Sequence, residues 1–259
     1  QFTHARDDTA FFGGDDGTGV AYLDGVWDFE DPGSNGFQGC SSWDKTSNPG
    51  TYFEWVVASD FTSHGDPCVP MIEGTPGMIW CGIHQDEADL RDFLAGMGYQ
   101  NSHCQSAFSP EYAIDPANDD IDLVFEYFNH TEPGFDYSYC YVLAYDAVGE
   151  LVEEHTVAVF DGIIGDDATP GIFDEGIEVP LGTLPPETDH VVIEFRMVSD
   201  GGWSDEDGLW DSPCGPFAVD DLSITVGATT DAFDFNDGPQ GFTFEKCPGK
   251  GAWLHIVHD

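Results

Sequence analysis

The sequence predicts an all-β fold, an antiparallel jelly-roll β-sandwich with one short helix, and three observations support this prediction. Aromatic residues are abundant in the 259-residue chain, with 20 Phe, 9 Tyr and 7 Trp. The 31 Gly and 16 Pro residues favour strands separated by tight turns. Runs of partly alternating apolar and polar residues recur, whereas only one segment has a helical pattern. Many strands with almost no helix favour an antiparallel sandwich over βαβ units.

The clearest strands are half-buried runs. In 121–128 and 191–198 apolar residues partly alternate with polar ones, as one buried face requires. Turn signals such as Asn35-Gly36 and Pro133-Gly134 separate the runs. The one helix is expected over Gln85–Leu94. The predicted strands are 20–30, 52–58, 121–128, 137–145, 155–160, 176–181, 190–198 and 217–226.

A repeated motif suggests how the chain is divided. Trp27-Asp-Phe-Glu-Asp31 with Asn35-Gly-Phe37 is similar to Phe233-Asp-Phe-Asn-Asp237 with Gln240-Gly-Phe242. Such self-similarity is typical of modular proteins. We therefore expect a leader or early hairpin over 1–19, a jelly-roll module over 20–228, and the beginning of a second similar module over 229–259. The chain would then be part of a larger protein.

The charge balance is strongly acidic. There are 50 Asp+Glu against 6 Lys+Arg, a formal net charge of -44. Nucleic acid binding requires a cationic surface and is excluded, and an anionic membrane surface would repel the chain. No apolar run is long enough to insert directly into a membrane. Two explanations of the charge remain open and compatible: solvation in a salty medium, and divalent cation binding by clustered carboxylates.

Seven cysteines are widely spaced and form no C-x-x-C pair. This pattern favours disulfides in an oxidising, extracellular compartment over a zinc or redox motif. The six expected to form disulfides are Cys40, Cys68, Cys81, Cys104, Cys140 and Cys214. One pairing is Cys40–Cys68, Cys81–Cys104 and Cys140–Cys214, which leaves Cys247 over, and other pairings stay open.

Motifs for catalysis are missing from the sequence. It contains no H-E-x-x-H, no G-x-S-x-G, no P-loop and no G-x-G-x-x-G. The run from Glu87 to Asp92 approaches a glycoside hydrolase pattern, but it falls in the expected helix. We therefore predict that the chain is not an enzyme.

The segment 199–224 holds the most distinctive pattern. An acidic, Gly-rich loop carries Asp200, Asp205 and Asp207 and leads into a strand with Asp220-Asp221. Asp205-Glu-Asp207-Gly208 is a candidate calcium loop, although it lacks the EF-hand spacing.

Two tryptophans, Trp203 and Trp210, lie in the same loop. They are candidates for a ligand-binding platform on which a sugar stacks. Alternatively, they plug one end of the sandwich.

Ordered motifs over about residues 27–226 resemble MAM-type jelly-roll modules, especially the immune-inhibitor-A-type C-terminal modules of bacterial secreted and surface proteins. The motifs are Phe29-Glu30, Gly36-Phe37, Trp80-Cys81-Gly82, Gly98-Tyr99, Ser109-Pro110, Ser199-Asp200-Gly201 and Val219-Asp220-Asp221-Leu222. The resemblance implies a two-sheet jelly roll whose first and last strands share a cation, usually calcium. Glu30 and Asp220 on adjacent strands would repel each other without one. The candidate metal ligands are Asp28, Glu30, Asp200, Asp205, Asp207, Asp220 and Asp221.

These observations predict a non-catalytic, calcium-stabilised binding or adhesion module of a secreted or cell-surface protein. Its partner would be a glycan or a protein at the cell surface. The alternative is a structural repeat subunit of a surface layer, fibre or filament, with neighbouring copies of itself as partners. A concave aromatic groove would favour the first function, and an edge completed by a neighbouring chain would favour the second.

Overall fold

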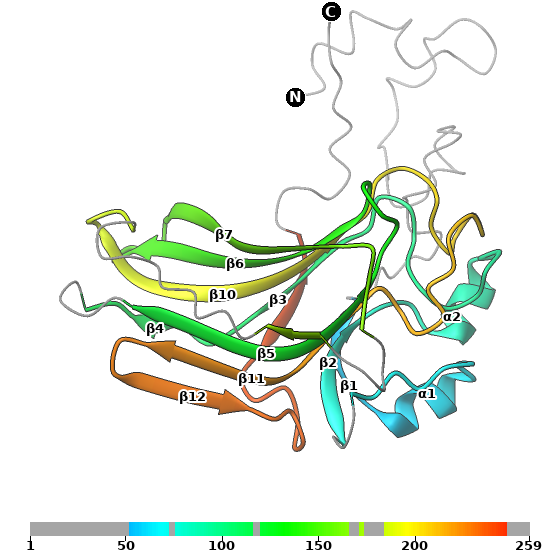
Figure 1. Ribbon diagram of the computed structural model, residues 1–259, viewed down its shortest axis with the longest axis horizontal. Coiled ribbons are helices and arrows are strands. Elements are labelled where there is room, and N and C mark those ends of the chain that lie inside the picture. The colour runs from blue at the N-terminus through cyan, green and yellow to red at the C-terminus, as the bar shows by residue number, and fades with distance from the viewer. Residues whose placement is uncertain (1–51, 73–75, 116–119, 166–170, 174–183, 248–259) are drawn as a thin grey trace, which may run out of the picture. The chain divides into compact units, whose positions relative to one another are not determined.

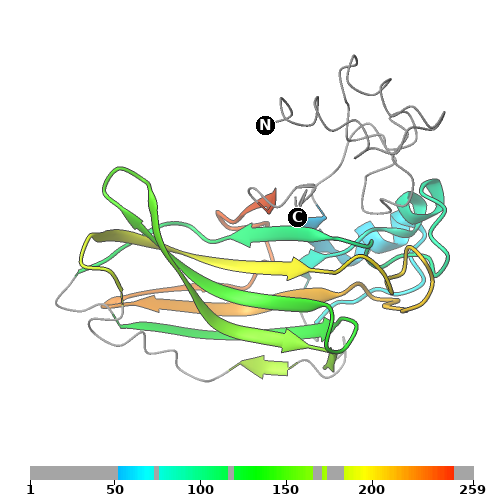
Figure 2. The ribbon, with the colours of Figure 1, turned by 90° about the horizontal axis from the view of Figure 1, so that it is seen from above.

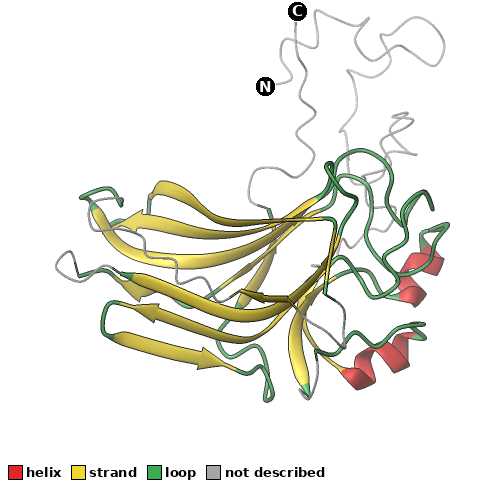
Figure 3. Ribbon diagram, in the orientation of Figure 1, coloured by secondary structure: helices red, strands yellow, loops and turns green. Residues whose placement is uncertain are grey.

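The computed structural model describes residues 52–72, 76–115, 120–165 and 184–247, with the backbone of 171–173. These residues form two antiparallel sheets that pack face to face (Figure 1). The predicted all-β sandwich is therefore confirmed. Two helices, α1 (Ala58–His64) and α2 (Gln85–Leu90), lie at the end of the sandwich where long loops gather, here called the loop end (Figure 3). Among the described residues, no helix is long and apolar enough to cross a membrane.

Sheet I has the order β1-β2-β11-β5-β8, with β12 paired to β11 and β9 paired to β5. Sheet II has the order β13-β3-β10-β6-β7, with β4 paired to β10, and Figure 2 views it from its outer side. The strands of sheet I are β1 (Phe53–Val57), β2 (Gly77–Cys81), β5 (Ile121–His130), β8 (Ile163–Ile164), β9 (Gly171–Phe173), β11 (Phe217–Val226) and β12 (Thr229–Phe233). Those of sheet II are β3 (Cys104–Phe108), β4 (Tyr112–Ala113), β6 (Tyr137–Asp146), β7 (Leu151–Asp161), β10 (Thr188–Val198) and β13 (Thr243–Lys246).

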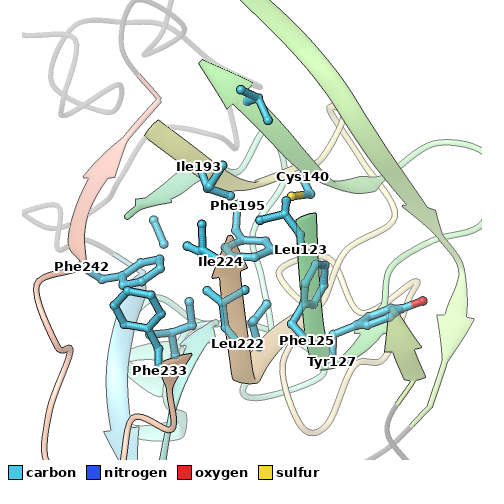
Figure 4. Packing of buried hydrophobic residues seen from close by; sticks show 14 of the residues in the cluster. Leu123, Phe125, Tyr127, Cys140, Ile193, Phe195, Leu222, Ile224, Phe233 and Phe242 are labelled. Atoms are coloured by element: carbon cyan, nitrogen blue, oxygen red, sulfur yellow. The ribbon is translucent and has the colours of Figure 1, made fainter. Parts of the chain in front are cut away.

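The main core lies between the sheets and is rich in phenylalanine (Figure 4). Phe125 of β5 meets Phe195 of β10 edge to face, with ring centroids 5.0 Å apart. Phe217 of β11 lies 6.3 Å from Phe195. Because alternate residues of each strand point inward, the half-buried runs predicted for β5 and β10 supply one wall each.

A second, smaller core covers the outer face of sheet I at the loop end. Phe61 of α1 packs edge to face on Trp80 of β2, with centroids 5.1 Å apart. The Trp80 Nε1–H donates to the Cys214 carbonyl at 2.9 Å. Gly215 has φ +83°, and a Cβ there would lie 2.4 Å from Trp80 Nε1, so only glycine fits. This packing fixes the start of β11 against β2.

The helices differ from the prediction. The helix expected over 85–94 is α2, which ends at Leu90, and Asp92 adopts a left-handed φ of 59° just after it. The helix α1 was not predicted, because the apolar run of β1 continues directly into it. Asp60 accepts a hydrogen bond from the Val57 N–H at 2.8 Å, and Gly65 ends α1 in the left-handed conformation.

The C-terminal part of the described chain completes the sandwich. β12 pairs with β11 in sheet I, and β13 pairs with β3 in sheet II. Phe233, Phe235 and Phe242 pack together, with centroids 5.2 and 5.3 Å apart for the two contacts of Phe242. The second-module boundary expected after residue 228 therefore does not occur among the described residues, because this aromatic motif closes the existing core. The first copy of the repeat, residues 27–37, and the expected strands 20–30 and 176–181 lie outside the described residues.

The two disulfides differ from the expected pairing. Cys68 is bonded to Cys214, and Cys104 is bonded to Cys247. Cys81 and Cys140 are buried free thiols, so the pairings Cys81–Cys104 and Cys140–Cys214 are wrong, and Cys247 is not left over. Cys40 lies outside the described residues, but its expected partner Cys68 is already bonded. Sequence spacing does not reveal which strands become neighbours, and connectivity follows from those neighbours.

Peptide mapping without reduction tests this connectivity. We expect linked peptides containing Cys68–Cys214 and Cys104–Cys247, because each bond joins segments far apart in the chain. Thiol alkylation should modify Cys81 and Cys140 only after unfolding, since both are buried. The paired substitution of Cys68 and Cys214 by Ser should lower the free energy of unfolding by about 2–5 kcal/mol. Alkylation of Cys81 in the native protein would contradict the assignment.

Candidate metal centre

Three carboxylates meet at the loop end and form the acidic cluster, which consists of Glu132, Asp136 and Asp200. Each offers one oxygen, and these oxygens all lie within 4.8 Å of one another. Glu132 and Asp136 belong to the turn between β5 and β6, and Asp200 follows β10. The cluster therefore joins two loops from different parts of the sequence.

Asp136 is held in place by hydrogen bonds although it is fully buried. The Tyr99 hydroxyl donates to Asp136 Oδ2 at 2.7 Å, and the Asp200 N–H donates to Asp136 Oδ1 at 2.7 Å. The Glu132 N–H donates to the Tyr99 hydroxyl oxygen at 3.2 Å. Tyr99 thus fixes both ends of the 132–136 turn, in which Gly134 has φ +81°.

The electrostatics of the acidic cluster favour a cation. Burial raises the pKa of Asp136 to about 6 against the opposing hydrogen bonds of Tyr99 and Asp200, and the charges of Asp200 and Asp207 raise it further. Burial and the charges of Asp136 and Asp200 also raise the pKa of Glu132. Burial is the main cause of both raised values, and repulsion between the neighbouring carboxylates adds to it. Calcium prefers oxygen ligands of this kind and would remove the repulsion.

Asp205 and Asp207, two of the expected ligands, accept hydrogen bonds from the surrounding loops. Asp205 is fully buried and accepts bonds from the Tyr99 N–H at 3.0 Å, and from the Ser212 N–H at 2.8 Å and hydroxyl at 2.6 Å. Burial raises the pKa of Asp205 to about 7. Asp207 accepts hydrogen bonds from the backbone N–H groups of Trp203 at 2.8 Å, Ser204 at 3.2 Å and Leu209 at 3.1 Å. Both carboxylates therefore hold the 199–215 loop together.

The Asp220-Asp221 pair forms a β-bulge. The register of β11 against β5 shifts between Asp220 and Ser223, and Asp221 has a left-handed φ of 45°. Asp220 Oδ1 accepts the Asp221 N–H at 2.7 Å. Before the bulge, Phe217 and Val219 face the core. The extra residue of the bulge shifts the alternation by one position, so that Leu222 and Ile224 face the core after it, which explains the apolar-Asp-Asp-apolar pattern.

Of the seven expected metal ligands, Asp200 belongs to the acidic cluster. Asp28 and Glu30 lie outside the described residues. Glu132 and Asp136 were missed, although carboxylates on both sides of the Pro133-Gly134 turn were a usable signal.

The two loop tryptophans have different surroundings. Trp203 is 56% exposed. Trp210 packs against the main core and meets His130 edge to face at 5.8 Å. Trp203 is therefore largely exposed, whereas Trp210 is partly buried against the main core.

A second cluster of charged side chains surrounds His84 at the loop end. Its Nδ1 lies 2.5 Å from Asp66 Oδ2, its Nε2 lies 3.3 Å from Glu54 Oε1, and its ring stacks on His64 at 4.3 Å. Burial alone would lower the pKa of His84, but the hydrogen bonds and charges of Asp66 and Glu54 raise it to about 9. Both ring nitrogens are engaged, so this imidazolium acts as a structural cation.

The buried thiol of Cys81 also has a histidine neighbour. Its Sγ lies 3.4 Å from His103 Nε2. Burial raises the pKa of the Cys81 thiol well above its usual value and lowers that of His103 to about 3. Both groups are neutral near pH 7, which is opposite to the thiolate–imidazolium pair of a cysteine nucleophile.

The stability of the protein should depend on the protonation of His84. Its folded pKa of about 9 lies above the ordinary 6.5, so its contribution is full below about pH 6.5 and is lost as the pH rises through 9. His84→Gln should therefore lower the free energy of unfolding by up to about 3 kcal/mol at or below about pH 6.5, and by much less above about pH 9. Chemical denaturation across this range measures the difference, with His155→Gln on β7 as the control. A cost of His84→Gln that does not change with pH would contradict the assignment.

Comparisons with known proteins give no family. No family model matches the chain, and no curated protein matches it. Among solved structures, one of infectious bursal disease virus, Gx strain, is similar at 13% identity with a TM-score of 0.26. That similarity covers 50% of this chain and 35% of the viral chain.

Proposed function

We propose that this chain is a non-catalytic binding module of an extracellular protein, in which calcium fastens the loop end of the sandwich. The observation that carries the proposal is the acidic cluster, because it brings three carboxylates from two loops within 4.8 Å. A cation there would join the turn after β5 to the loop after β10. The loop that it fastens also presents Trp203, which is 56% exposed.

Two features support an extracellular location. The disulfides Cys68–Cys214 and Cys104–Cys247 are compatible with an oxidising compartment. The net charge of -44 suits a medium rich in salt or divalent cations, where self-repulsion is screened. We propose on this basis, and on the resemblance to MAM-type modules, that the chain belongs to a secreted or cell-surface protein.

A structural role in a layer, fibre or filament is the second candidate. It is favoured by β7, which among the described strands pairs only with β6 and forms an edge of sheet II. Leu151 and Val159 on this strand are 50% and 52% exposed. An open edge strand can pair with a strand of another copy.

Sedimentation velocity at increasing protein concentration tests whether the chain self-associates. A monomer at all concentrations would contradict the structural role.

Calcium should stabilise the folded protein. Removal of calcium with EDTA at constant ionic strength should lower the midpoint of thermal unfolding by roughly 5–10 °C, and calcium should restore it. Asp200→Asn and Glu132→Gln should each remove most of this shift, because each deletes a charged ligand of the acidic cluster.

The matched control is Asp122→Asn, which removes an exposed carboxylate of β5. It should keep the full calcium shift. An equal loss of the calcium-dependent stabilisation in all three variants would indicate a general charge effect. If calcium does not raise the unfolding midpoint of the unmodified protein, the calcium site is overturned.

A further inference from the structure

Four large exposed apolar side chains lie on two segments of the loop end, 90–94 and 203–209, and are together called the apolar loop patch. Leu90 is 78% exposed, Leu94 is 76% exposed, and Trp203 and Leu209 are each 56% exposed. Leu90 ends α2, Leu94 follows it, and the other two belong to the loop between β10 and β11. Such groups of exposed apolar side chains usually mark interaction sites in soluble proteins.

Backbone contacts bring the two segments of the patch together. The Leu94 N–H donates to the Glu206 carbonyl at 3.2 Å, and the Ala95 N–H donates to the Asp205 carbonyl at 3.1 Å. A Cβ at Gly208 would lie 2.7 Å from the Leu94 Cβ. Leu94 therefore lies directly beside the residue that precedes Leu209.

The loop is built so that it presents the apolar side chains. Asp207 accepts the N–H groups of both Trp203 and Leu209, at 2.8 and 3.1 Å, and so fixes the backbone of both. Trp203 has a left-handed φ of 63°, a conformation that is costly for a bulky residue. The hydrogen bond from the Trp203 N–H to Asp207 holds this conformation, which leaves the side chain more than half exposed.

The rim of the patch is acidic. Exposed carboxylates on the same segments are Asp89, Asp92 and Asp211. The nearby cation Arg91 is 2% exposed and donates internally, to Gln100 at 2.8 Å and to Glu87 at 2.6 Å. An apolar centre with an acidic rim is complementary to a surface with apolar anchors and a cationic rim.

We infer that the apolar loop patch docks a cationic amphipathic segment of a partner protein. The inference rests on the proposed function, since it names the partner class of the binding module. A second copy's patch is a poor occupant, because it has the same acidic rim and two such rims facing each other would repel. The apolar face of the segment would cover Trp203 and Leu209, and its Lys or Arg side chains would face the rim carboxylates.

Isothermal titration calorimetry with synthetic peptides tests the inference at about 0.15 M salt, where long-range attraction is screened. The probe is a Leu/Lys peptide with all Leu on one helical face, and its control is a scrambled peptide of the same composition. We expect saturable binding of the amphipathic peptide and at least about tenfold weaker binding of the scrambled one. Equal binding of both would overturn the inference, because charge alone would then explain it.

Variants locate the binding surface. Trp203→Ala with Leu209→Ser should weaken peptide binding at least about tenfold. The control pair, Leu151→Ser with Val159→Ser, removes exposed apolar side chains of β7 without changing the charge, and it should leave binding unchanged. Unchanged binding in the first pair would overturn the inference. Binding of a neutral oligosaccharide that is lost in the first pair, without peptide binding, would also overturn it in favour of a glycan ligand.

The calcium experiment separates this inference from the proposed function. A calcium-dependent rise in thermal stability without peptide binding would remove only the docking inference. Peptide binding that persists in EDTA, without any calcium shift, would support the docking surface and remove the calcium site.

Discussion

The scarcity of cations is the constraint on which the rest of the structure depends. With 50 carboxylates and 6 Lys and Arg residues, nearly all carboxylates must face water, and each buried one needs donors. Asp205 has the Tyr99 and Ser212 donors. Glu194 is paired with Arg196, whose guanidinium lies 4.4 Å from the centre of the Tyr141 ring. Where side-chain cations are not available, backbone N–H groups and histidine replace them.

Because of this constraint, the centre of the sandwich and its loop end are stabilised by different interactions. The centre of the sandwich is held by aromatic packing around Phe125, Phe195 and Phe217. At the loop end, carboxylates that accept bonds from neighbouring loops, principally Asp205 and Asp207, add to the small core around Trp80 and to the Cys68–Cys214 disulfide. Asp136 is buried with a raised pKa beside two more carboxylates, and an external cation would compensate this site. The same excess of negative charge makes a cationic partner the complementary one for the apolar loop patch.

Sequence patterns predicted the strands with one buried face, such as β5 and β10, because their alternation is local information. They missed β2, in which all five residues are buried and nothing alternates. The disulfides and the acidic cluster depend on contacts between distant segments, since Asp136 and Asp200 are 64 residues apart. The Asp220-Asp221 pattern predicts a metal site from sequence alone, and the structure shows that the pair also forms a β-bulge. Local pattern thus predicts the walls of the sandwich, and only tertiary structure reveals how its loops meet.

Anomalous diffraction from crystals grown with calcium is the most direct test of the central claim that a cation fastens the loop end. A single strong anomalous peak among Glu132, Asp136 and Asp200, with oxygen ligands at about 2.3–2.6 Å, is the predicted result. A peak at Asp220 and Asp221, or no peak at the loop end in crystals soaked in a saturating concentration of calcium, would contradict the account. In that case the carboxylates of the acidic cluster would be satisfied by protons and by donors of the chain alone.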